Sequence, residues 1–291
     1  MQKEIAVIGA ALGWGARWPE TELGPDTVRE AGILKQLKLP NMLTIQTEIS
    51  ACLGERRGYS EKLQLIYDFS HRLAQETERV SQAKKCPLVI GGDHAIAIGT
   101  WQGIKAGSRS EQFGLLWVDA HLDSHTPETS LSHNIHGMPL AVLLGYGESA
   151  LTHLKSKSPT LLPQHVALLG VRSADPGETE LIQSLGVRVF TMNEIMDRGL
   201  SEVMAEAKDI VTQETDAFGM SIDVDAFDPS FAPGTGCPEP NGLDPNELLP
   251  YLQNFSSHPH FCGLEIAEFN PTKDEHDKTL SLIRDLASIL V

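Results

Sequence analysis

Cysteine and positive charge are both scarce in this sequence. Four of the 291 residues are cysteines, and none forms a C-x-x-C pair with another, which argues against a zinc knuckle or a thioredoxin-type site. Cys86 and Cys262 open apolar runs, so we expect both to be buried thiols. Asp and Glu number 39 against 23 Lys and Arg, which gives a net charge of −16. Because nucleic-acid binding requires cations that neutralise phosphates, this composition argues against a nucleic-acid partner.

Long apolar runs are absent as well. No stretch approaches the roughly 18 consecutive apolar residues that a membrane-spanning helix needs, so we expect no membrane partner. The apolar run that begins at Ile5 is short and follows the acidic Glu4, which is untypical of a signal peptide and fits a first strand. A cytoplasmic location is therefore the expectation.

What the sequence does contain is a regular alternation of short elements. Several short runs are continuously apolar, which is typical of strands buried on both faces of a parallel sheet. The predicted strands are Ile5–Gly9, Leu43–Gln46, Pro87–Gly91, Gly114–Asp119, Val166–Gly170, Val187–Phe190, Phe218–Asp223 and Phe261–Ile266. The predicted helices are Pro25–Leu37, Ser60–Ala83, Ile96–Ala106, Gly177–Leu185, Ser201–Thr212, Pro245–Phe255 and Lys273–Leu290.

This alternation predicts an α/β fold, with βαβ units that form one mostly parallel sheet covered by helices. Hydrophobic residues make up 41% of the chain and charged residues 21%, which is close to the average of soluble globular proteins. No Pro-, Gly- or Ser-rich linker divides the chain, so we expect residues 1–291 to form a single domain.

Polar side chains collect where four of the predicted strands end. Ligands of open α/β sheets bind in the crevice outside the carboxyl ends of the strands, so these segments should converge. Side chains at positions i, i+2 and i+4 of an extended chain point to the same side, so each segment presents its polar residues together. The residues are His94, then Asp119, His121 and Asp123, then Asp223 and Asp225, and finally Glu268.

Apart from Glu268, this set comprises two imidazoles and four carboxylates. Four carboxylates so close together would repel one another unless cations neutralised them, and two divalent ions supply the charge required. Oxygen ligands combined with imidazole suit Mn²⁺, with Co²⁺, Zn²⁺ and Fe²⁺ as alternatives. Two such ions about 3.5–4 Å apart can share one water and lower its pKa enough to give hydroxide near neutral pH.

The alternative to a metal site is that each polar segment has only a structural role, as a loop or as the cap of a helix. One D-x-D or G-G-D-H segment alone would not predict a metal site. Three of them, each directly after an apolar strand, would cluster buried and unpaired Asp side chains, which is costly without a cation. The sequence therefore predicts a two-metal site.

The order of these motifs resembles that of the arginase family of ureohydrolases over nearly the whole chain. The similar segments are IAVIGAALGWG, ELGPDTVREAGIL, GGDHAIAIGT, WVDAHLDSHTP, NIHGMP, SIDVDAFDPSFAPGTG and EIAEFNP. The resemblance implies a three-layer α/β/α domain around an eight-stranded parallel sheet, and hydrolysis of L-arginine to L-ornithine and urea by a metal-bridging hydroxide. It also implies two Mn²⁺ ions per subunit, held by His94, Asp119, His121, Asp123, Asp223 and Asp225.

Within this family, four residues resemble the positions that hold the amino acid part of the substrate in arginases. Ser132 and Asn134 match positions that contact its carboxylate, and Asp175 and Glu178 match positions that contact its α-amino group. Ser and Asn donate hydrogen bonds to an anion, and carboxylates pair with an ammonium group. The run DPGE is also typical of a type I turn and a helix start, so a purely structural role stays open.

Three further residues of the same region depart from the arginase pattern. His125 stands where arginases usually have Asn, Ser130 where they have Thr, and Cys237 where arginases and agmatinases both have Thr. We expect these side chains to contact the substrate. Another guanidino compound, such as hydroxyarginine, agmatine or guanidinobutyrate, is therefore the alternative to L-arginine.

The resemblance also implies catalytic roles for three residues. Asp123 would orient the hydroxide as a bridging ligand. Glu268 would pair with the planar guanidinium, because a carboxylate matches its fork of donors. His136, whose imidazole titrates near neutral pH, would carry a proton to the leaving amine, unless it only satisfies backbone groups of its loop.

Two alternatives belong to other classes of protein. A mononuclear zinc deacylase would need only three protein ligands, whereas six are present. A non-catalytic metal-binding or regulatory protein would be expected to lack some of the ligands, and none is missing. The resemblance further implies a homo-oligomer, either a trimer or a hexamer.

Overall fold

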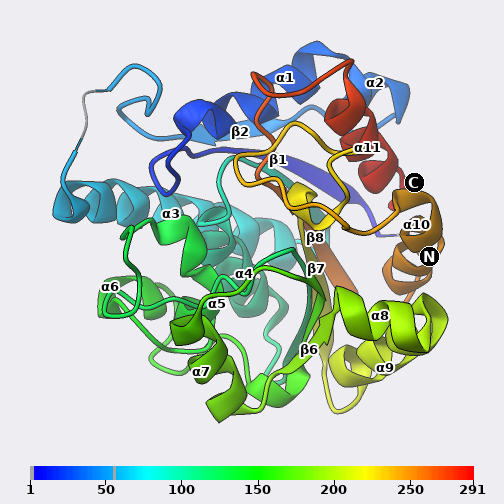
Figure 1. Ribbon diagram of the computed structural model, residues 1–291. Coiled ribbons are helices and arrows are strands. Elements are labelled where there is room, and N and C mark those ends of the chain that lie inside the picture. Colours follow the sequence, from blue (N-terminus) through cyan, green and yellow to red (C-terminus); the bar gives the residue numbers. More distant parts are fainter. Residues whose placement is uncertain (1–2, 55–56) are drawn as a thin grey trace.

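The computed structural model describes residues 3–54 and 57–291, and its strands form one sheet (Figure 1). The strands are β1 (Ile5–Ala11), β2 (Leu43–Gln46), β3 (Cys86–Gly91), β4 (Phe113–Val118), β5 (Val166–Val171), β6 (Arg188–Thr191), β7 (Ala217–Asp223) and β8 (Phe261–Ala267). Their order is β2-β1-β3-β8-β7-β4-β5-β6, and every neighbouring pair is parallel. The predicted eight-stranded sheet is confirmed, and it is entirely parallel.

Helices connect the strands, as parallel pairing requires. The α-helices are α1 (Gly24–Glu30), α2 (Ile33–Gln36), α3 (Tyr59–Gln82), α4 (Ile96–Ser108), α5 (Pro139–Leu143), α6 (Ser149–Thr152), α7 (Pro176–Leu185), α8 (Met192–Arg198), α9 (Leu200–Thr212), α10 (Pro245–Ser256) and α11 (Lys278–Ser288). Short 3₁₀ turns occupy Pro19–Leu23, Ile135–Gly137, Pro163–His165 and Val224–Ala226. Among the described residues, no helix combines the length and the apolar character needed to cross a bilayer.

The helices cover both faces of the sheet, which confirms the three-layer α/β/α arrangement. On one face, α1, α2, α9, α10 and α11 pack through side chains such as Val28, Leu248 and Leu286. On the other face, α3, α4 and α5 pack through side chains such as Phe69 and Leu140. Figure 1 shows α3 to α6 gathered on one side of the sheet and α10 and α11 on the other.

Two of the predicted helices are wrong in extent. The run predicted as one helix, Pro25–Leu37, is divided into α1 and α2, because Gly32 adopts a left-handed φ of 73° that interrupts the helix. The helix predicted from Lys273 begins only at Lys278. The Asp274 carboxylate accepts the backbone N–H groups of Thr279 and Leu280, so the preceding residues form a turn that caps the helix.

Helices α3 and α4 lie unusually close together, because α4 carries glycines on the side that faces α3. A Cβ atom at Gly99 would lie 2.6 Å from the carbonyl oxygen of Ser70. A Cβ atom at Gly103 would lie 2.0 Å from Oγ1 of Thr77 and 2.3 Å from the carbonyl oxygen of Ala74. The close approach fixes α4, and with it the loop that joins β3 to α4.

The buried thiols were predicted correctly, since Cys86 and Cys262 are both buried. Cys86 begins β3 and Cys262 lies near the start of β8. Both are at the amino ends of their strands. The polar residues of interest follow the opposite ends of the strands, where β3, β8, β7 and β4 are neighbours in the middle of the sheet.

Candidate metal centre

The candidate centre lies at the carboxyl ends of the four central strands. His94 follows β3, Asp119 follows β4 and Asp223 ends β7, while Glu268 follows β8. Since these strands are neighbours in the sheet, residues far apart in the sequence meet at one edge. Asp123 and Glu268 have positive φ angles of 47° and 67°, a backbone conformation that non-glycine residues rarely adopt. Backbone strain of this kind is often kept at functional sites.

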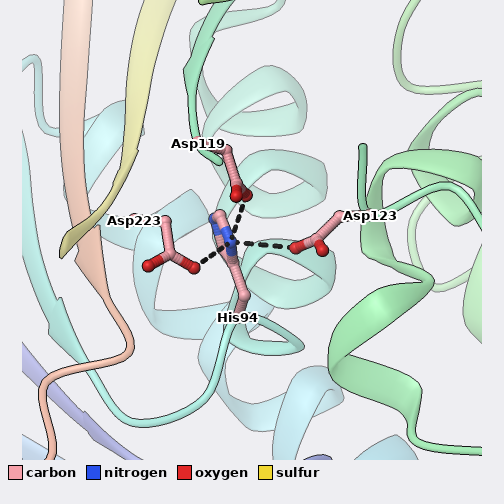
Figure 2. Close-up of side chains that lie close together, drawn as sticks. All are labelled: His94, Asp119, Asp123 and Asp223. Atoms are coloured by element: carbon pink, nitrogen blue, oxygen red, sulfur yellow. Dashed lines mark ion pairs between the residues drawn. The ribbon is translucent and has the colours of Figure 1, made fainter. Parts of the chain in front are cut away.

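A first group of ligand atoms surrounds Nδ1 of His94, as Figure 2 shows. The Oδ2 atom of Asp123 lies 3.0 Å from Nδ1, and those of Asp119 and Asp223 each lie 3.2 Å from it. All four side chains are buried. The four ligand atoms lie within 4.8 Å of one another, which is close enough to hold a single ion.

A second group of ligand atoms lies beside the first and shares Asp119 with it. Nδ1 of His121 lies 3.1 Å from Oδ2 of Asp225 and 3.5 Å from Oδ1 of Asp119. Asp119 therefore presents one oxygen to each imidazole. A carboxylate placed in this way is suited to bridge two cations, whereas Asp123, which was expected to bridge, belongs to the first group alone.

Local turns explain how each segment presents two ligands together. Oδ1 of Asp119 accepts the backbone N–H of His121 at 2.7 Å, and Oδ1 of Asp223 accepts that of Asp225 at 2.8 Å. In both segments, the first carboxylate thus orders the turn that places the second ligand. The i, i+2 grouping predicted from the sequence is observed.

The chemistry of these two groups fits divalent cations. Nδ1 of His94 is buried and has no hydrogen-bond partner among the described residues, although three carboxylate oxygens surround it. Burial, together with the charges of Asp225 and Asp119, raises the pKa of Asp223 well above its ordinary value. Four buried carboxylates cannot all be ionised at low cost without cations between them. The residues present therefore match a binuclear metal site.

A buried polar network beneath the first group was not predicted from the sequence. Nε2 of His94 lies 3.0 Å from Oγ of Ser221, which donates a hydrogen bond to Glu265 at 2.7 Å. Glu265 also accepts the indole N–H of Trp101 at 3.2 Å. Because Ser221 donates to Glu265, its oxygen accepts from Nε2–H of His94, which leaves Nδ1 as a lone pair for a cation. The sequence feature that could have indicated this network is Glu265, a carboxylate within the otherwise apolar strand β8.

A pocket lies above the two groups of ligand atoms, and the remaining predicted residues line it. His94 and Asp119 are completely buried beneath it. The pocket is lined by His121, Asp123, His125, Ser130, Ser132, Asn134, His136, Gly137, Ser173, Ala174, Asp175, Glu178, Asp223, Asp225, Cys237 and Glu268. Every residue predicted to contact substrate thus lies on its wall, and Ser173, Ala174 and Gly137 are additions.

His136 and Glu268 form a close pair on this wall. Nδ1 of His136 lies 3.0 Å from Oε1 of Glu268, which also accepts the backbone N–H of His94 at 2.8 Å. Burial opposes the charged imidazole, but the Glu268 carboxylate outweighs it and raises the pKa of His136 to about 9. The second oxygen of Glu268, Oε2, has no hydrogen bond within the described residues and remains available to a ligand.

The mouth of the pocket is formed by the loop after β4 and the start of α7. The side chain of Glu178 is almost fully buried, whereas that of Asp175 is 69% exposed. The side chain of His125 extends from the loop after β4 toward this pair, and its Nε2 lies 3.2 Å from Oδ2 of Asp175. Ser132 is exposed at the rim and Asn134 is partly buried.

Cys237 is exposed on the pocket wall. The residue is exposed as a whole, but the surrounding pocket wall partly desolvates its thiol, and this effect, followed by the negative charges of Glu268 and Asp225, raises the pKa of Cys237 to about 12. The thiol is therefore neutral in the physiological range and is a weak nucleophile. At this position Cys237 acts as a small apolar surface with a weak hydrogen-bond donor.

Comparison with known proteins agrees with the geometry. The model of the arginase family matches residues 3–291. The chain is 38% identical to an arginase of Bacillus caldovelox over 286 residues, which cover 96% of this chain and 95% of that protein. It is 35% identical to an arginase of Brevibacillus brevis over 283 residues, which cover 96% and 94%. The crystal structure of an arginase from Bacillus subtilis superposes with a TM-score of 0.90 at 34% identity, covering 99% of this chain and 98% of that one.

Proposed function

The chain belongs to the arginase family and is a hydrolase of amidine carbon–nitrogen bonds, and we propose that it converts L-arginine to L-ornithine and urea. The observation that carries this proposal is a pocket with a guanidinium partner, Glu268, directly above two groups of metal ligands. Curated arginases with 32–38% identity over nearly the whole chain support L-arginine as the substrate.

The chain has a binuclear metal site, and we propose that it holds two Mn²⁺ ions, with Co²⁺, Zn²⁺ or Fe²⁺ as substitutes. The proposed ligands are His94, Asp119, His121, Asp123, Asp223 and Asp225. Bound there, two divalent ions would lower the pKa of a coordinated water enough to supply a nucleophile near neutral pH. Carboxylate oxygens and imidazole form a mixed donor set that suits Mn²⁺.

Glu268 is proposed to bind and orient the guanidinium. Its Oε1 is occupied by the backbone of His94 and the imidazole of His136, so Oε2 is the oxygen that faces a ligand. The backbone hydrogen bond fixes the carboxylate, so that a guanidinium bound to Oε2 would lie close to the metal ligands. Asp123, which lines the same pocket, is proposed to orient the attacking water.

His136 is proposed to hold the proton that the departing amine requires. Its pairing with Glu268 keeps the imidazole protonated at neutral pH. Nδ1 faces Glu268, so the proton on Nε2 is the one available to a substrate nitrogen. General acid catalysis of this kind contributes about 10²–10⁴-fold to a rate.

The outer part of the pocket is proposed to recognise the amino acid part of L-arginine. Asp175 and Glu178 supply negative charge for an α-ammonium group. Ser130, Ser132 and Asn134 supply donors for a carboxylate. His125 and Cys237 complete the wall that these residues form.

The extent of the domain, its location and its oligomeric state are part of the same proposal. All eight strands, from Ile5 to Ala267, join one sheet, which supports a single catalytic domain over residues 1–291. We place this domain in the cytoplasm, as a homotrimer or homohexamer that binds no nucleic acid and no membrane. Light scattering of the purified protein would measure the assembly.

The decisive experiment is urea release by the Mn²⁺-loaded protein from L-arginine, with agmatine, hydroxyarginine and guanidinobutyrate in parallel. Agmatine lacks the α-carboxylate and guanidinobutyrate lacks the α-amino group, so each removes one contact of the outer pocket. The highest kcat/KM is expected for L-arginine. A higher value for another guanidine would overturn the proposed substrate, and no turnover of any of them by the metal-loaded protein would favour a non-catalytic role.

A further inference from the structure

We propose a third divalent-cation site at the mouth of the pocket, formed by Nε2 of His125 and the carboxylates of Asp175 and Glu178. Nε2 lies 3.2 Å from Oδ2 of Asp175 and 3.5 Å from Oε2 of Glu178. The three ligand atoms lie within 4.8 Å of one another, and none of these residues belongs to the two groups beneath the pocket. One imidazole and two carboxylates are a donor set that Zn²⁺ and related ions accept.

The imidazole of His125 is held through both of its ring nitrogens. Nδ1 lies 3.1 Å from Oγ1 of Thr129, and that oxygen also accepts the backbone N–H of Thr126 at 2.9 Å. Thr129 thereby holds the ring, and Nε2 points at the carboxylates of Asp175 and Glu178. Metal-binding histidines typically have their second nitrogen held by a hydrogen bond in this way. A cation between the three groups would be attracted by both carboxylates and would have Nε2 as a third ligand.

The protein holds the two carboxylates and the loop in this arrangement. Oε1 of Glu178 accepts the backbone N–H of Ser124 at 3.1 Å, which ties α7 to the loop that carries His125. A Cβ atom at Gly177 would lie 2.8 Å from Cβ of Thr129, so only glycine lets the loop approach the start of α7 so closely. Burial raises the pKa of Glu178, and the neighbouring His125 opposes that rise. The carboxylate thus gains from any further positive charge nearby.

The consequence of an ion at this position depends on the proposed function. If Asp175 and Glu178 hold the α-ammonium of L-arginine, an ion bound to the same carboxylates excludes it. Excess Zn²⁺ would then raise KM for L-arginine and leave kcat unchanged. Replacement of Mn²⁺ in the binuclear site would instead change kcat, so the two effects are distinguishable.

The test is a count of metal ions that does not depend on turnover. The Mn²⁺-loaded protein is dialysed against increasing Zn²⁺, and the sum of both metals per subunit is measured by mass spectrometry. Wild type is expected to reach three ions per subunit. His125→Asn should remain at two ions, or bind the third at least about tenfold more weakly, because one ligand is lost.

A matched control comes from the same loop. His133 lies with its ring against Tyr59, at a centroid distance of 5.6 Å, and is not part of the cluster. His133→Asn should therefore keep the third ion. Retention of two ions by His125→Asn would show that this variant is folded. A wild-type total of two ions, or a third ion that persists in His125→Asn, would overturn the proposal.

Steady-state kinetics provide a second, independent test of the third site. The KM of wild type for L-arginine should rise with Zn²⁺ at constant kcat, whereas the KM of His125→Asn should not respond. If the protein released urea from none of the guanidines, the proposed function would fail, but the ion count would still decide whether the third site exists.

Discussion

Nδ1 of His136 lies 3.0 Å from Oε1 of Glu268, and the same oxygen accepts the backbone N–H of His94. One carboxylate thus connects a proposed proton donor with the residue at the centre of the first ligand group. Because Oε1 is used in this way, Glu268 can meet a guanidinium through Oε2 without releasing His136. The proposed proton donor and a guanidinium bound to Oε2 would therefore be held in one fixed relationship.

Removal of the imidazole of His136 tests its role as proton donor. His136→Asn should lower kcat for L-arginine by about 100-fold or more, since the leaving amine loses its acid. The metal content should stay at two ions per subunit, because His136 is not among the proposed ligands. An unchanged kcat at full metal content would assign the proton transfer to another group.

The His136–Glu268 pair should also make the stability of the metal-free protein depend on pH. The pKa of His136 is raised to about 9 by Glu268, against burial, so the pair stabilises the folded state fully below about pH 6.5, the ordinary pKa of His. This contribution is lost as the pH rises through about 9. The difference in Tm between wild type and His136→Asn should be largest near about pH 6 and vanish by about pH 10. A difference independent of pH would show that the pair is not ionic.

Much of this molecule could be predicted from sequence because its signals are local. Continuous apolar runs locate the buried strands, and the i, i+2 spacing after Asp119 and Asp223 locates the proposed ligands. The network of Ser221, Glu265 and Trp101 could not be predicted, because it joins elements far apart in sequence. The break at Gly32 was missed since one glycine within an amphipathic run is compatible with a helix.

The shared carboxylate of Asp119 predicts how ions are lost. Asp119 belongs to both ligand groups, whereas Asp225 belongs only to the second. Asp119→Ala should therefore lose both ions, and Asp225→Ala should retain about one ion per subunit. Metal analysis after gel filtration measures this directly. Equal ion contents of the two variants would show that Asp119 does not bridge.

The buried network beneath His94 predicts an effect on metal affinity without any change of ligand. Glu265→Gln keeps the volume of the side chain but replaces one carboxylate oxygen with an amide NH₂, which weakens the acceptor that orients Ser221. Outer hydrogen-bond partners of metal ligands typically contribute about 10–100-fold to affinity, so the variant should bind its ions more weakly by that factor. Titration of the metal-free protein with Mn²⁺ measures the affinity. Wild-type affinity in Glu265→Gln would mean that packing alone sets the orientation of His94. That packing includes the stacking of His94 on Trp117, whose ring centroids are 4.2 Å apart.

The close contact between α3 and α4 predicts that one Gly→Ala substitution destabilises the protein instead of stabilising it. Within a helix, Gly→Ala ordinarily stabilises a protein by roughly 0.5–1 kcal/mol. At Gly103 the added Cβ would lie 2.3 Å from a backbone oxygen of α3, which cannot move aside alone. Gly103→Ala should therefore destabilise the fold by about 1–3 kcal/mol, the usual cost of overpacking a core.

Denaturant unfolding of Gly103→Ala measures this cost, and Gly58→Ala is the control, since a Cβ at Gly58 meets nothing within 4 Å. Gly58 is the N-cap of α3, where Ala is less favourable than Gly, so the control should lower the free energy of unfolding by no more than about 1 kcal/mol. If Gly103→Ala were as stable as wild type, α3 and α4 would have room to separate. The glycine would then not be what sets their distance, and the position of the β3–α4 loop that carries His94 would have to come from the sheet alone.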